Sequence, residues 1–479
     1  MRLIIIGSGY VGLVSGTCLA ELGHDVLCVD CDRTKIANLR AGRLPIFEPK
    51  LAEMVARNLR NGRLHFAETL PTIGLETAAV IIAVGTPPLP NGSADLSAIL
   101  AAARDIAGKA THNVLVAIKS TVPVATGDLV EAVMIGERPD LSIMVASNPE
   151  FLREGSAIDD FMGADRIVVG TNSDAAQKIL KAVYAPLSLK GIPIVCVDRR
   201  GSELIKYAAN AFLATKIAFI NEIADFCEAI DADIDQVAAG VGLDRRIGSA
   251  FLQAGPGYGG SCFPKDTSAL LTSAQDHAVN LRLVETTIAS NEARRRGLGQ
   301  RVTAALGGSV AGRTISVLGI TFKPNTDDTR DAPGLALAAA LQSGGARLRV
   351  FDPKGMSMAQ PQLQKAFFAE DAYQCAQGSD CIVLATHWAE FASLDPVRLA
   401  QLVKRRVLVD LRNGLDAEAF SDAGFVVHGI GRRRRLPKVR STPVVITRRR
   451  MIDRRQSATH LLNGSGAGLP PPEHNGLPR

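Results

Sequence analysis

One cysteine of the chain stands in a segment whose composition suits covalent chemistry. Cys262 lies within GPGYGGSCFPKD, residues 255–266, where the glycines let the backbone approach a ligand closely. Pro264 suits the first helical position, which would place Cys262 just ahead of a helix N-terminus. The positive end of that helix and the adjacent Lys265 are expected to favour the reactive thiolate. Asp266, in the first turn, could hydrogen-bond a water or a substrate hydroxyl. We therefore interpret Cys262 as a nucleophile rather than as a structural cysteine.

A second segment predicts a dinucleotide site near the N-terminus. GSGYVG, residues 7–12, matches G-x-G-x-x-G directly after a strand-like run and at the start of a helical one. Gly7 permits the tight turn, Gly9 lets the backbone approach a pyrophosphate, and Gly12 allows helix and strand to pack closely. Asp30 ends the next strand-like run, where a carboxylate hydrogen-bonds a ribose 2′-hydroxyl and repels a 2′-phosphate. The pattern favours NAD over NADP, and it favours a cofactor loop over a purely structural glycine turn.

Two polar residues share one side of a long predicted helix. Apolar residues recur every three or four positions from Ser202 to about Ile230, with few helix breakers. The pattern predicts a helix on the order of 40 Å long at 1.5 Å per residue. Lys206 and Asn210 are four residues apart and lie among alanines, so they share a face that is unlike a solvated surface. We interpret this face as lining a site.

Further polar residues follow predicted strands, at the edge where ligands bind in open α/β sheets. The residues at such positions are Thr86, Thr121, Glu150, Glu154, Lys323 and Arg330. Thr86 and Thr121 offer hydroxyls there. The two cations follow the same predicted strand, and they suit an anionic ligand rather than a merely exposed charged loop.

Strand-like and helical segments alternate in two regions, which predicts two parallel, doubly wound sheets. The strand-like runs are residues 3–6, 26–30, 80–84 and 114–120 in the first region, and 314–318, 348–352, 381–386 and 407–410 in the second. We expect an α/β fold of four parts. They are an N-terminal Rossmann-type NAD domain (1–198), a central helical domain with the long helix and the Cys262 loop (199–300), a second Rossmann-like α/β domain (301–432) and an Arg-rich disordered tail (433–479).

Composition argues against several classes of protein. No run of 18 or more apolar residues is present, so no transmembrane helix is expected. The N-terminal apolar run enters a glycine loop rather than a signal-peptide cleavage site, so we expect a cytoplasmic protein. The eight cysteines include a C-x-x-C at Cys28 and Cys31 with no second ligand pair at a suitable spacing, so no metal site is expected.

The net charge is unevenly distributed. From Gly431 to the end there are 12 Lys and Arg residues and two acids, a charge of +10, which leaves −4 on the rest of a chain whose total is +6. The folded body therefore has no compositional reason to bind nucleic acid or membrane. Two alternatives stay open for the tail, a soluble extension and a segment that binds an acidic surface, and its partner stays unknown.

Together these segments resemble the UDP-glucose 6-dehydrogenase family, within the wider UDP-glucose/GDP-mannose dehydrogenase superfamily. The matching pieces, spread in order over residues 1–432, are GSGYVG, GTPP, KSTVP, NPEFLREG, ELIKYAANAFLATKIAFINEIA, FLQAGPGYGGSCFPKD, GITFKPNTDDTRDAP and GIGR. The resemblance implies an N-terminal NAD domain, a helical middle that forms a homodimer or a higher homo-oligomer, and a C-terminal domain for the nucleotide-sugar.

The resemblance also implies roles for individual residues. Cys262 would be the nucleophile, and Lys206 with help from Asn210 would stabilise an oxyanion. Asp266 would act with a water in proton transfer, Glu150 would assist thioester hydrolysis, and Thr121 would also belong to the catalytic group. Contacts with NAD are implied for Gly7, Gly9, Val11, Gly12, Asp30, Lys35, Thr86, Thr121, Glu154, Lys265 and Arg330. Contacts with the UDP-sugar are implied for Glu150, Phe151, Leu152, Arg153, Glu154, Lys206, Asn210, Phe251, Leu252, Gln253, Ala254, Gly255, Gly259, Lys323 and Arg412. Arg412 stands in DLRN, which departs from the commoner DGRN.

The expected reaction is the four-electron oxidation of UDP-glucose at C6 to UDP-glucuronate, with two NAD consumed in sequence. A thiohemiacetal on Cys262 would present an sp³ carbon for the second hydride, and water would hydrolyse the resulting thioester. Three alternatives stay open. They are the same chemistry on GDP-mannose or a UDP-N-acetylmannosamine, a two-electron hydroxyacid dehydrogenase, and a non-catalytic, NAD-sensing interaction protein.

Overall fold

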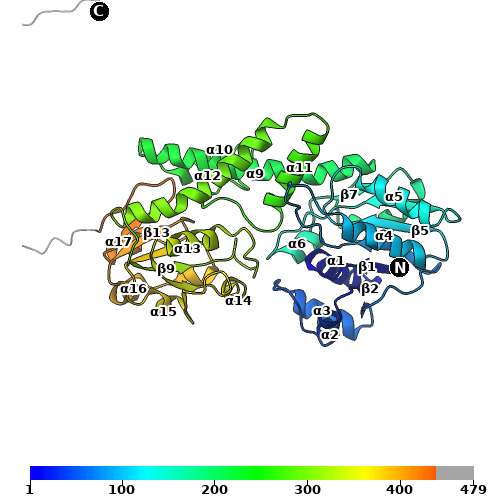
Figure 1. Cartoon of the computed structure of the whole chain (residues 1–479), viewed down its shortest axis with the longest axis horizontal. Helices are drawn as coiled ribbons and strands as arrows, with labels where there is room; N and C mark the ends of the chain where they lie inside the picture. The colour runs from blue at the N-terminus through cyan, green and yellow to red at the C-terminus, as the bar shows by residue number, and fades with distance from the viewer. Residues whose placement is uncertain (438–479) are drawn as a thin grey trace, which may run out of the picture. The chain divides into compact units, whose positions relative to one another are not determined.

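The computed structural model describes residues 1–437, which form two sheets of mainly parallel strands and a set of long central helices (Figure 1). The prediction of an α/β fold with two Rossmann-like sheets and a helical middle is confirmed. Most of the predicted disordered tail lies outside the described residues. The predicted domain limits at 198, 300 and 432 stay predictions.

The N-terminal sheet has eight strands in the order β3-β2-β1-β4-β5-β6-β7-β8. The bounds are β1 Arg2–Ile6, β2 Asp25–Val29, β3 Leu64–Ala67, β4 Thr77–Ile82, β5 Val114–Ile118, β6 Ile143–Ser147, β7 Ile167–Gly170 and β8 Ile194–Val197. Neighbouring strands pair in parallel, except that β6 and β7 pair antiparallel. The inner strands are buried on both faces, which explains why they appear in the sequence as unbroken apolar runs.

Helices cover both faces of this sheet. They are α1 Tyr10–Glu21, α2 Arg33–Arg40, α3 Leu51–Arg60, α4 Ser97–Lys109, α5 Thr126–Glu137, α6 Ala157–Met162, α7 Asp174–Val183 and α8 Ala185–Ser188. Successive residues of a strand point to opposite faces, so Leu3 and Ile5 join one hydrophobic core while Ile4 joins the other. The first βα turn, between β1 and α1, carries the GSGYVG segment at the carboxyl end of the sheet.

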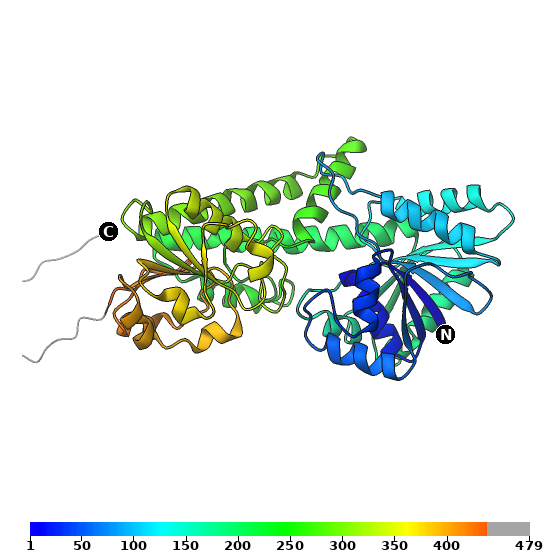
Figure 2. The same ribbon diagram turned by 60° about the horizontal axis from the view of Figure 1, so that its bottom comes forward.

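The middle of the chain is helical. Its elements are α9 Arg199–Ile230, α10 Ile234–Gly242, α11 Phe263–Asp276 and α12 Arg282–Ala305, and α12 lies alongside α9 (Figures 1 and 2). The long helix begins three residues before the predicted start, because the Asp198 side chain accepts a hydrogen bond from the Gly201 amide and caps it. It ends at Ile230, and the capping residue Asp231 adopts a left-handed conformation with φ 60°.

The C-terminal sheet has six parallel strands in the order β11-β10-β9-β12-β13-β14. The strands are β9 Thr314–Leu318, β10 Arg347–Phe351, β11 Phe367–Phe368, β12 Cys381–Leu384, β13 Val407–Asp410 and β14 Val426–His428. The helices are α13 Pro333–Ser343, α14 Met356–Ala359, α15 Ala372–Ala376, the 3₁₀ turn η1 Ala389–Ser393, α16 Pro396–Leu402 and α17 Ala417–Asp422. One hydrophobic core joins this sheet to Ile220 and Ala224 of α9 and Leu298 of α12. The central helices are therefore packed directly against the second sheet.

Candidate active site

The three glycines of the first βα turn differ in what surrounds them. Gly7 has φ +97°, and a Cβ there would lie 2.6 Å from the carbonyl oxygen of Ala83. A Cβ on Gly12 would lie 1.8 Å from the Gly7 oxygen, so helix α1 could not approach strand β1 with any other residue. Around Gly9 no atom lies within 4 Å of the position of a Cβ. This open backbone at the start of α1 fits a pyrophosphate group.

Asp30 follows β2 directly and faces this turn. Its Oδ2 accepts hydrogen bonds from the Ser8 amide at 2.8 Å and from Lys35 Nζ at 2.9 Å. Burial pushes the pKa of Asp30 upwards, but the hydrogen bonds from Lys35 and from two backbone amides outweigh it and leave the pKa lowered. The Ser8 hydroxyl is buried and has no partner among the described residues. The ionised carboxylate of Asp30 and the hydroxyl of Ser8, which is free to form a hydrogen bond, therefore flank Gly9.

Cys262 stands at the junction of the glycine-rich loop and α11. It occupies the N-cap position, and the helix begins at Phe263, so Pro264 is the second helical residue rather than the predicted first. The placement of Cys262 directly before a helix N-terminus is nevertheless as expected. Ser261 Oγ lies 3.6 Å from Cys262 Sγ.

The expectation of a readily ionised thiol is wrong for this structure. Burial raises the pKa of Cys262 to about 11, and the negative charges of Glu150 and Asp266 act in the same direction against Lys206. Lys265, predicted to favour the thiolate, instead places its Nζ 2.6 Å from Asp266 Oδ1. The thiol is therefore neutral near pH 7, and its proton must leave when sulfur attacks.

Lys206 and Glu150 form a buried ion pair behind this cysteine. Lys206 Nζ lies 3.1 Å from Glu150 Oε1, and the two side chains are 4% and 5% exposed. The other Glu150 oxygen accepts a hydrogen bond from the Leu152 amide. Burial lowers the pKa of Lys206, but the charges of Glu150, Cys262 and Asp266 outweigh burial and raise it. Lys206 is therefore held as a cation beside the thiol.

Asp266 is the centre of a second polar group. Asn210 Nδ2 donates to its Oδ2 at 2.6 Å, while Lys265 holds the other oxygen. The predicted shared face of Lys206 and Asn210 is present in α9, and it meets α11 and the segment after β6. Side chains that are far apart in the sequence, from Glu150 to Asp266, therefore lie together near Cys262.

Cys262 opens onto a cavity of about 670 Å³. Eleven of the predicted site residues line it: Leu152, Arg153, Glu154, Phe251, Gln253, Ala254, Gly255, Gly259, Cys262, Lys323 and Arg412. Predicted substrate residues that do not line it are Glu150, Phe151, Leu252, Lys206 and Asn210. Leu252 packs into the core that joins α9 to the second sheet. A cavity of this size can accommodate a nucleotide-sugar.

Several lining residues were not predicted. They are Ile217, Asp235, Gly257, Tyr258, Ser261, Phe263, Phe322, Pro324, His387, Asn413 and Gly414. His387 and Asn413 follow strands β12 and β13, so the strand-end rule that selected Lys323 could also have found them. Asp235 is paired with Arg432 across almost two hundred positions, for which the sequence offers no local signal.

The charges in the cavity wall are strongly perturbed. Burial raises the pKa of Glu154 to about 7, aided by Asp328 and opposed by a hydrogen bond from Thr326. Burial lowers the pKa of Lys323, and it lowers that of Arg412 to about 10. Arg412 donates to the carbonyl oxygens of Ala385 and Phe322 at 2.8 Å, so it holds two loops at the carboxyl edge of the second sheet.

The remaining predicted cofactor residues lie at the N-terminal sheet or beside Glu154. Thr86 Oγ1 donates to the Thr121 carbonyl at 2.9 Å, which joins the loops after β4 and β5. Val11 is half-buried on α1. Arg330 pairs with Asp328 at 2.7 Å and approaches Glu154 Oε1 at 3.7 Å. Their contacts with NAD stay predictions.

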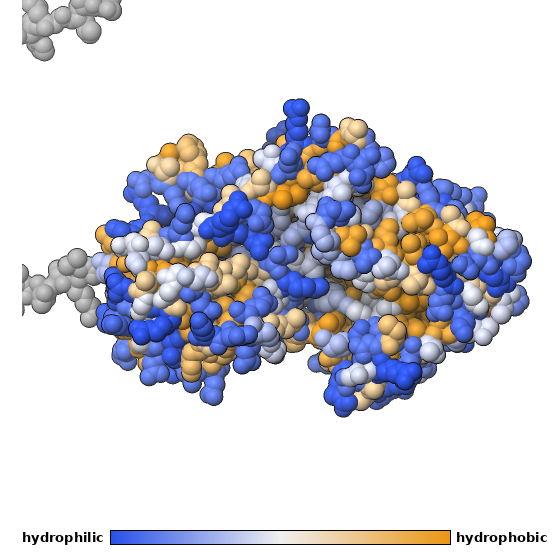
Figure 3. All heavy atoms as spheres, viewed as in Figure 1, coloured by the Kyte–Doolittle hydropathy of each residue, from blue (hydrophilic) through white to orange (hydrophobic). Residues whose placement is uncertain are grey.

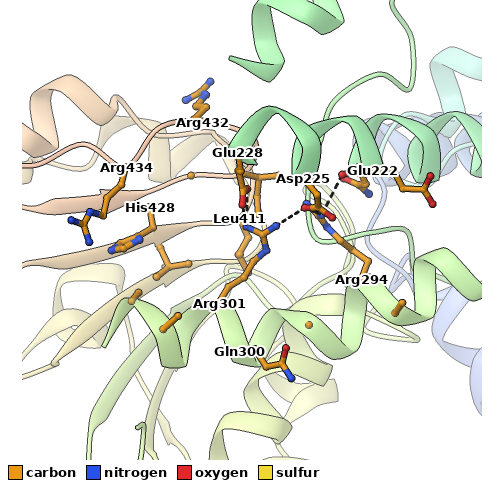
Figure 4. A pocket seen from close by; sticks show the side chains of 18 of the residues that line it. Glu222, Asp225, Glu228, Arg294, Gln300, Arg301, Leu411, His428, Arg432 and Arg434 are labelled. Carbon is orange, nitrogen blue, oxygen red and sulfur yellow. Dashed lines mark hydrogen bonds and ion pairs between the residues drawn. The ribbon is translucent and has the colours of Figure 1, made fainter. Parts of the chain in front are cut away.

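A second cavity, of about 1000 Å³, lies among α9, α12 and the segment after β14 (Figure 4). Asp225 and Glu228 of α9 lie opposite Arg294 and Arg301 of α12, and Asp225 accepts from both arginines at 2.5 Å. Cys262 does not line this cavity. Burial lowers the pKa of Arg294 in its wall, although Asp225 opposes that shift.

Three family descriptions match the chain in order. They are "UDP-glucose/GDP-mannose dehydrogenase family, NAD binding domain" over residues 1–188, the family's central domain over 200–293, and its UDP binding domain over 316–417. The chain belongs to the UDP-glucose/GDP-mannose dehydrogenase family. It is an enzyme of that family with NAD as its cofactor, as the GSGYVG segment and Asp30 predicted.

Members of this family are similar to the chain over nearly its whole length. The UDP-glucose 6-dehydrogenase of Rhizobium meliloti (strain 1021) is 52% identical over 435 residues, which cover 90% of this chain and 100% of that protein. UDP-glucose 6-dehydrogenase TuaD of Bacillus subtilis (strain 168) is 44% identical over 443 residues, covering 92% and 94%. A solved UDP-glucose dehydrogenase from Pyrobaculum islandicum superposes with a TM-score of 0.82 at 38% identity, covering 90% and 98%. The resemblance drawn from the motifs is therefore confirmed.

Three further properties bear on membranes, partners and metal ions. Among the described residues, no helix is both long and apolar enough to cross a membrane. Hydrophilic and hydrophobic residues are interspersed over the face drawn in Figure 3. Within residues 1–437, no group of three His, Cys, Asp or Glu side chains is placed to hold a metal ion. The cytoplasmic location expected from the sequence stays a prediction.

Proposed function

We propose that this enzyme oxidises UDP-glucose at C6 to UDP-glucuronate, in two successive two-electron steps, through covalent intermediates on Cys262. The observation that carries the proposal is that the thiol of Cys262, in the wall of one cavity, meets a buried cation, Lys206, and two buried carboxylates, Glu150 and Asp266, which lie outside the cavity lining. High identity to proteins named UDP-glucose 6-dehydrogenase supports the choice of UDP-glucose.

In the first oxidation the C6 hydroxyl loses a proton and C6 loses a hydride, which gives an aldehyde. NAD, held at the glycine turn beside Asp30, would supply a hydride acceptor for each oxidation, which no side chain provides. Asp266 accepts the proton through a water, because its carboxylate is held by Asn210 and Lys265 beside the thiol. The cation of Lys206 stabilises negative charge on the C6 oxygen.

In the second half, Cys262 sulfur adds to the aldehyde carbon and the thiol proton ends on the new hydroxyl. The neutral thiol of this site suits that step, since no thiolate has to be stored. The thiohemiacetal then loses a hydride from C6 and a proton from oxygen, which leaves a thioester. A water adds to the thioester carbon with help from Glu150, the carbon–sulfur bond breaks, and the free thiol returns. Two hydrides and one water account for the conversion of alcohol to carboxylate.

The stoichiometry tests the proposal directly. The purified protein is incubated with UDP-glucose and excess NAD, and NADH is counted against sugar consumed. We expect a ratio of two, with UDP-glucuronate as the product. A ratio of one would refute the four-electron scheme, and NAD binding without turnover would favour the NAD-sensing alternative.

Replacing the nucleophile provides a second test. Cys262→Ser should abolish the overall oxidation and leave NAD affinity nearly unchanged, because Cys262 lies in the central loop and not in the glycine turn. Full turnover in this variant would contradict the covalent route.

We also propose that the enzyme is a homodimer or a higher homo-oligomer built on α9. Phe212, Phe219 and Phe226 recur every seven residues and therefore share one stripe of the helix, where they are 66%, 51% and 60% exposed. Such a row of exposed aromatic side chains is costly to leave in water. Light scattering on the wild type and on Phe219→Asp should show a larger mass for the wild type.

A further inference from the structure

The glycine-rich loop that lines the cavity is held from behind by polar side chains of two helices. Residues 255 and 258 both line the cavity, and Cys262 follows four positions later. Their backbone groups are bound by Asn221 of α9 and by Asn291 and Arg294 of α12. These three side chains are only 4%, 4% and 9% exposed.

At Gly255 both backbone groups are bound. Asn221 Oδ1 accepts a hydrogen bond from the Gly255 amide at 2.8 Å, and Arg294 Nε donates to the Gly255 carbonyl at 3.0 Å. Arg294 also donates through Nη1 to the Asn221 carbonyl at 3.3 Å. The two peptide groups on either side of the Gly255 Cα are therefore held by side chains of two helices.

At Tyr258 a single side chain binds both groups. Asn291 Oδ1 accepts from the Tyr258 amide at 2.9 Å, and its Nδ2 donates to the Tyr258 carbonyl at 3.1 Å. Between these two anchor points, Gly257 has φ +100°, and a Cβ there would lie 2.6 Å from Asn291 Oδ1. The loop needs glycine at this position partly because the asparagine is there.

Arg294 is itself fixed at its far end. It lines the charged cavity of Figure 4, where Asp225 accepts from its Nη1 at 2.5 Å and Arg301 binds both Asp225 and Glu228. Burial of a guanidinium with one carboxylate and two carbonyl partners is costly unless each bond is kept. Such an arrangement suits a rigid support and not a surface contact.

We propose that Asn221, Asn291 and Arg294 are positioning residues that keep the Gly255–Tyr258 backbone in the shape that accepts the nucleotide-sugar. The proposal rests on the proposed function for the identity of the substrate. The three residues touch the loop and not Cys262, which has its own support from α11. Losing them should therefore weaken substrate binding more than the chemical steps.

The test compares Asn221→Ala with Asn221→Asp, since aspartate keeps an oxygen that can accept from the Gly255 amide and lies beside Arg294. Ser290→Ala is the matched control, because it removes another α12-to-α9 hydrogen bond, to Glu222 at 2.6 Å, without touching the loop. We expect KM for UDP-glucose to rise about tenfold in Asn221→Ala, because a buried amide loses its partner, with kcat within twofold. Asn221→Asp should recover most of this loss, and Ser290→Ala should show none.

Amide hydrogen exchange provides a readout that does not depend on catalysis. The Gly255 amide should exchange faster in Asn221→Ala, and the Tyr258 amide should exchange faster in Asn291→Ala, while Ser290→Ala resembles the wild type. If the wild type does not oxidise UDP-glucose, the proposed function fails and the exchange pattern still decides the positioning role. Unchanged exchange at both amides, or equal KM values for Asn221→Ala and Asn221→Asp, would overturn the proposal.

Discussion

Removing the cation of the buried Lys206–Glu150 pair would test how this site is held together. Lys206→Met keeps most of the side-chain volume but leaves Glu150 as a buried carboxylate whose cation, formerly at 3.1 Å, is gone. Both side chains are at most 5% exposed. The loss of unfolding free energy should therefore be that of a buried ion pair rather than the small loss typical of a surface pair. Breaking a buried pair from one side costs about 3 to 5 kcal/mol. We therefore expect a large loss of thermal stability near neutral pH.

The matched control is the double variant Lys206→Met with Glu150→Gln, in which no uncompensated charge remains. Calorimetric melting of the wild type, the single variant and the double variant at pH 7 should give the lowest midpoint for the single variant, with substantial recovery in the double variant. In the wild type the raised pKa of Lys206 contributes stability that is complete below pH 10.5 and is lost as pH rises through the folded-state value.

Catalysis should fall in both variants. The cation is the group proposed to stabilise charge on the C6 oxygen, and loss of one such group lowers kcat by about 100 to 1000-fold. A single variant that melts within a degree of the wild type would refute the interpretation of Lys206 and Glu150 as a buried ion pair in which each charge stabilises the other. A double variant no more stable than the single variant would refute it as well.

Three further predictions follow from the geometry of individual residues. Gly9→Ala should weaken NAD binding measured by calorimetry while leaving melting nearly unchanged, whereas Gly12→Ala should also destabilise the N-terminal sheet, because its Cβ would lie 1.8 Å from the Gly7 oxygen. The raised pKa of Glu154 contributes stability that is present below pH 4.5 and lost as pH rises towards about 7, so Glu154→Gln should flatten the melting temperature over that window. Alkylation of Cys262 by iodoacetamide in the ligand-free enzyme should accelerate up to about pH 11, and a plateau near pH 7 would contradict the raised pKa of this thiol.

The division between what could and could not be predicted is clearest at Cys262. Its place before a helix N-terminus was predictable, because Pro264 and the preceding glycines determine the local backbone conformation through their own residue types. Its pKa was predicted in the wrong direction, because the sequence shows Lys265 next to Asp266 but not that Lys265 binds Asp266. The burial that raises the pKa comes from segments far away in the chain.

The same division holds for the whole protein. By itself the sequence determined the two Rossmann-like sheets, the long helix and the NAD turn, since apolar periodicity, strand ends and glycine spacing are local properties. Only the tertiary structure decided that Lys206 pairs with Glu150, that Asp235 meets Arg432 at the cavity, and that Asn221 and Arg294 hold Gly255. The physical reason is that pairing and burial depend on which distant segments of the chain come together in a low-dielectric interior. The spacing of residues in the sequence does not encode the distance between two such segments in the folded protein.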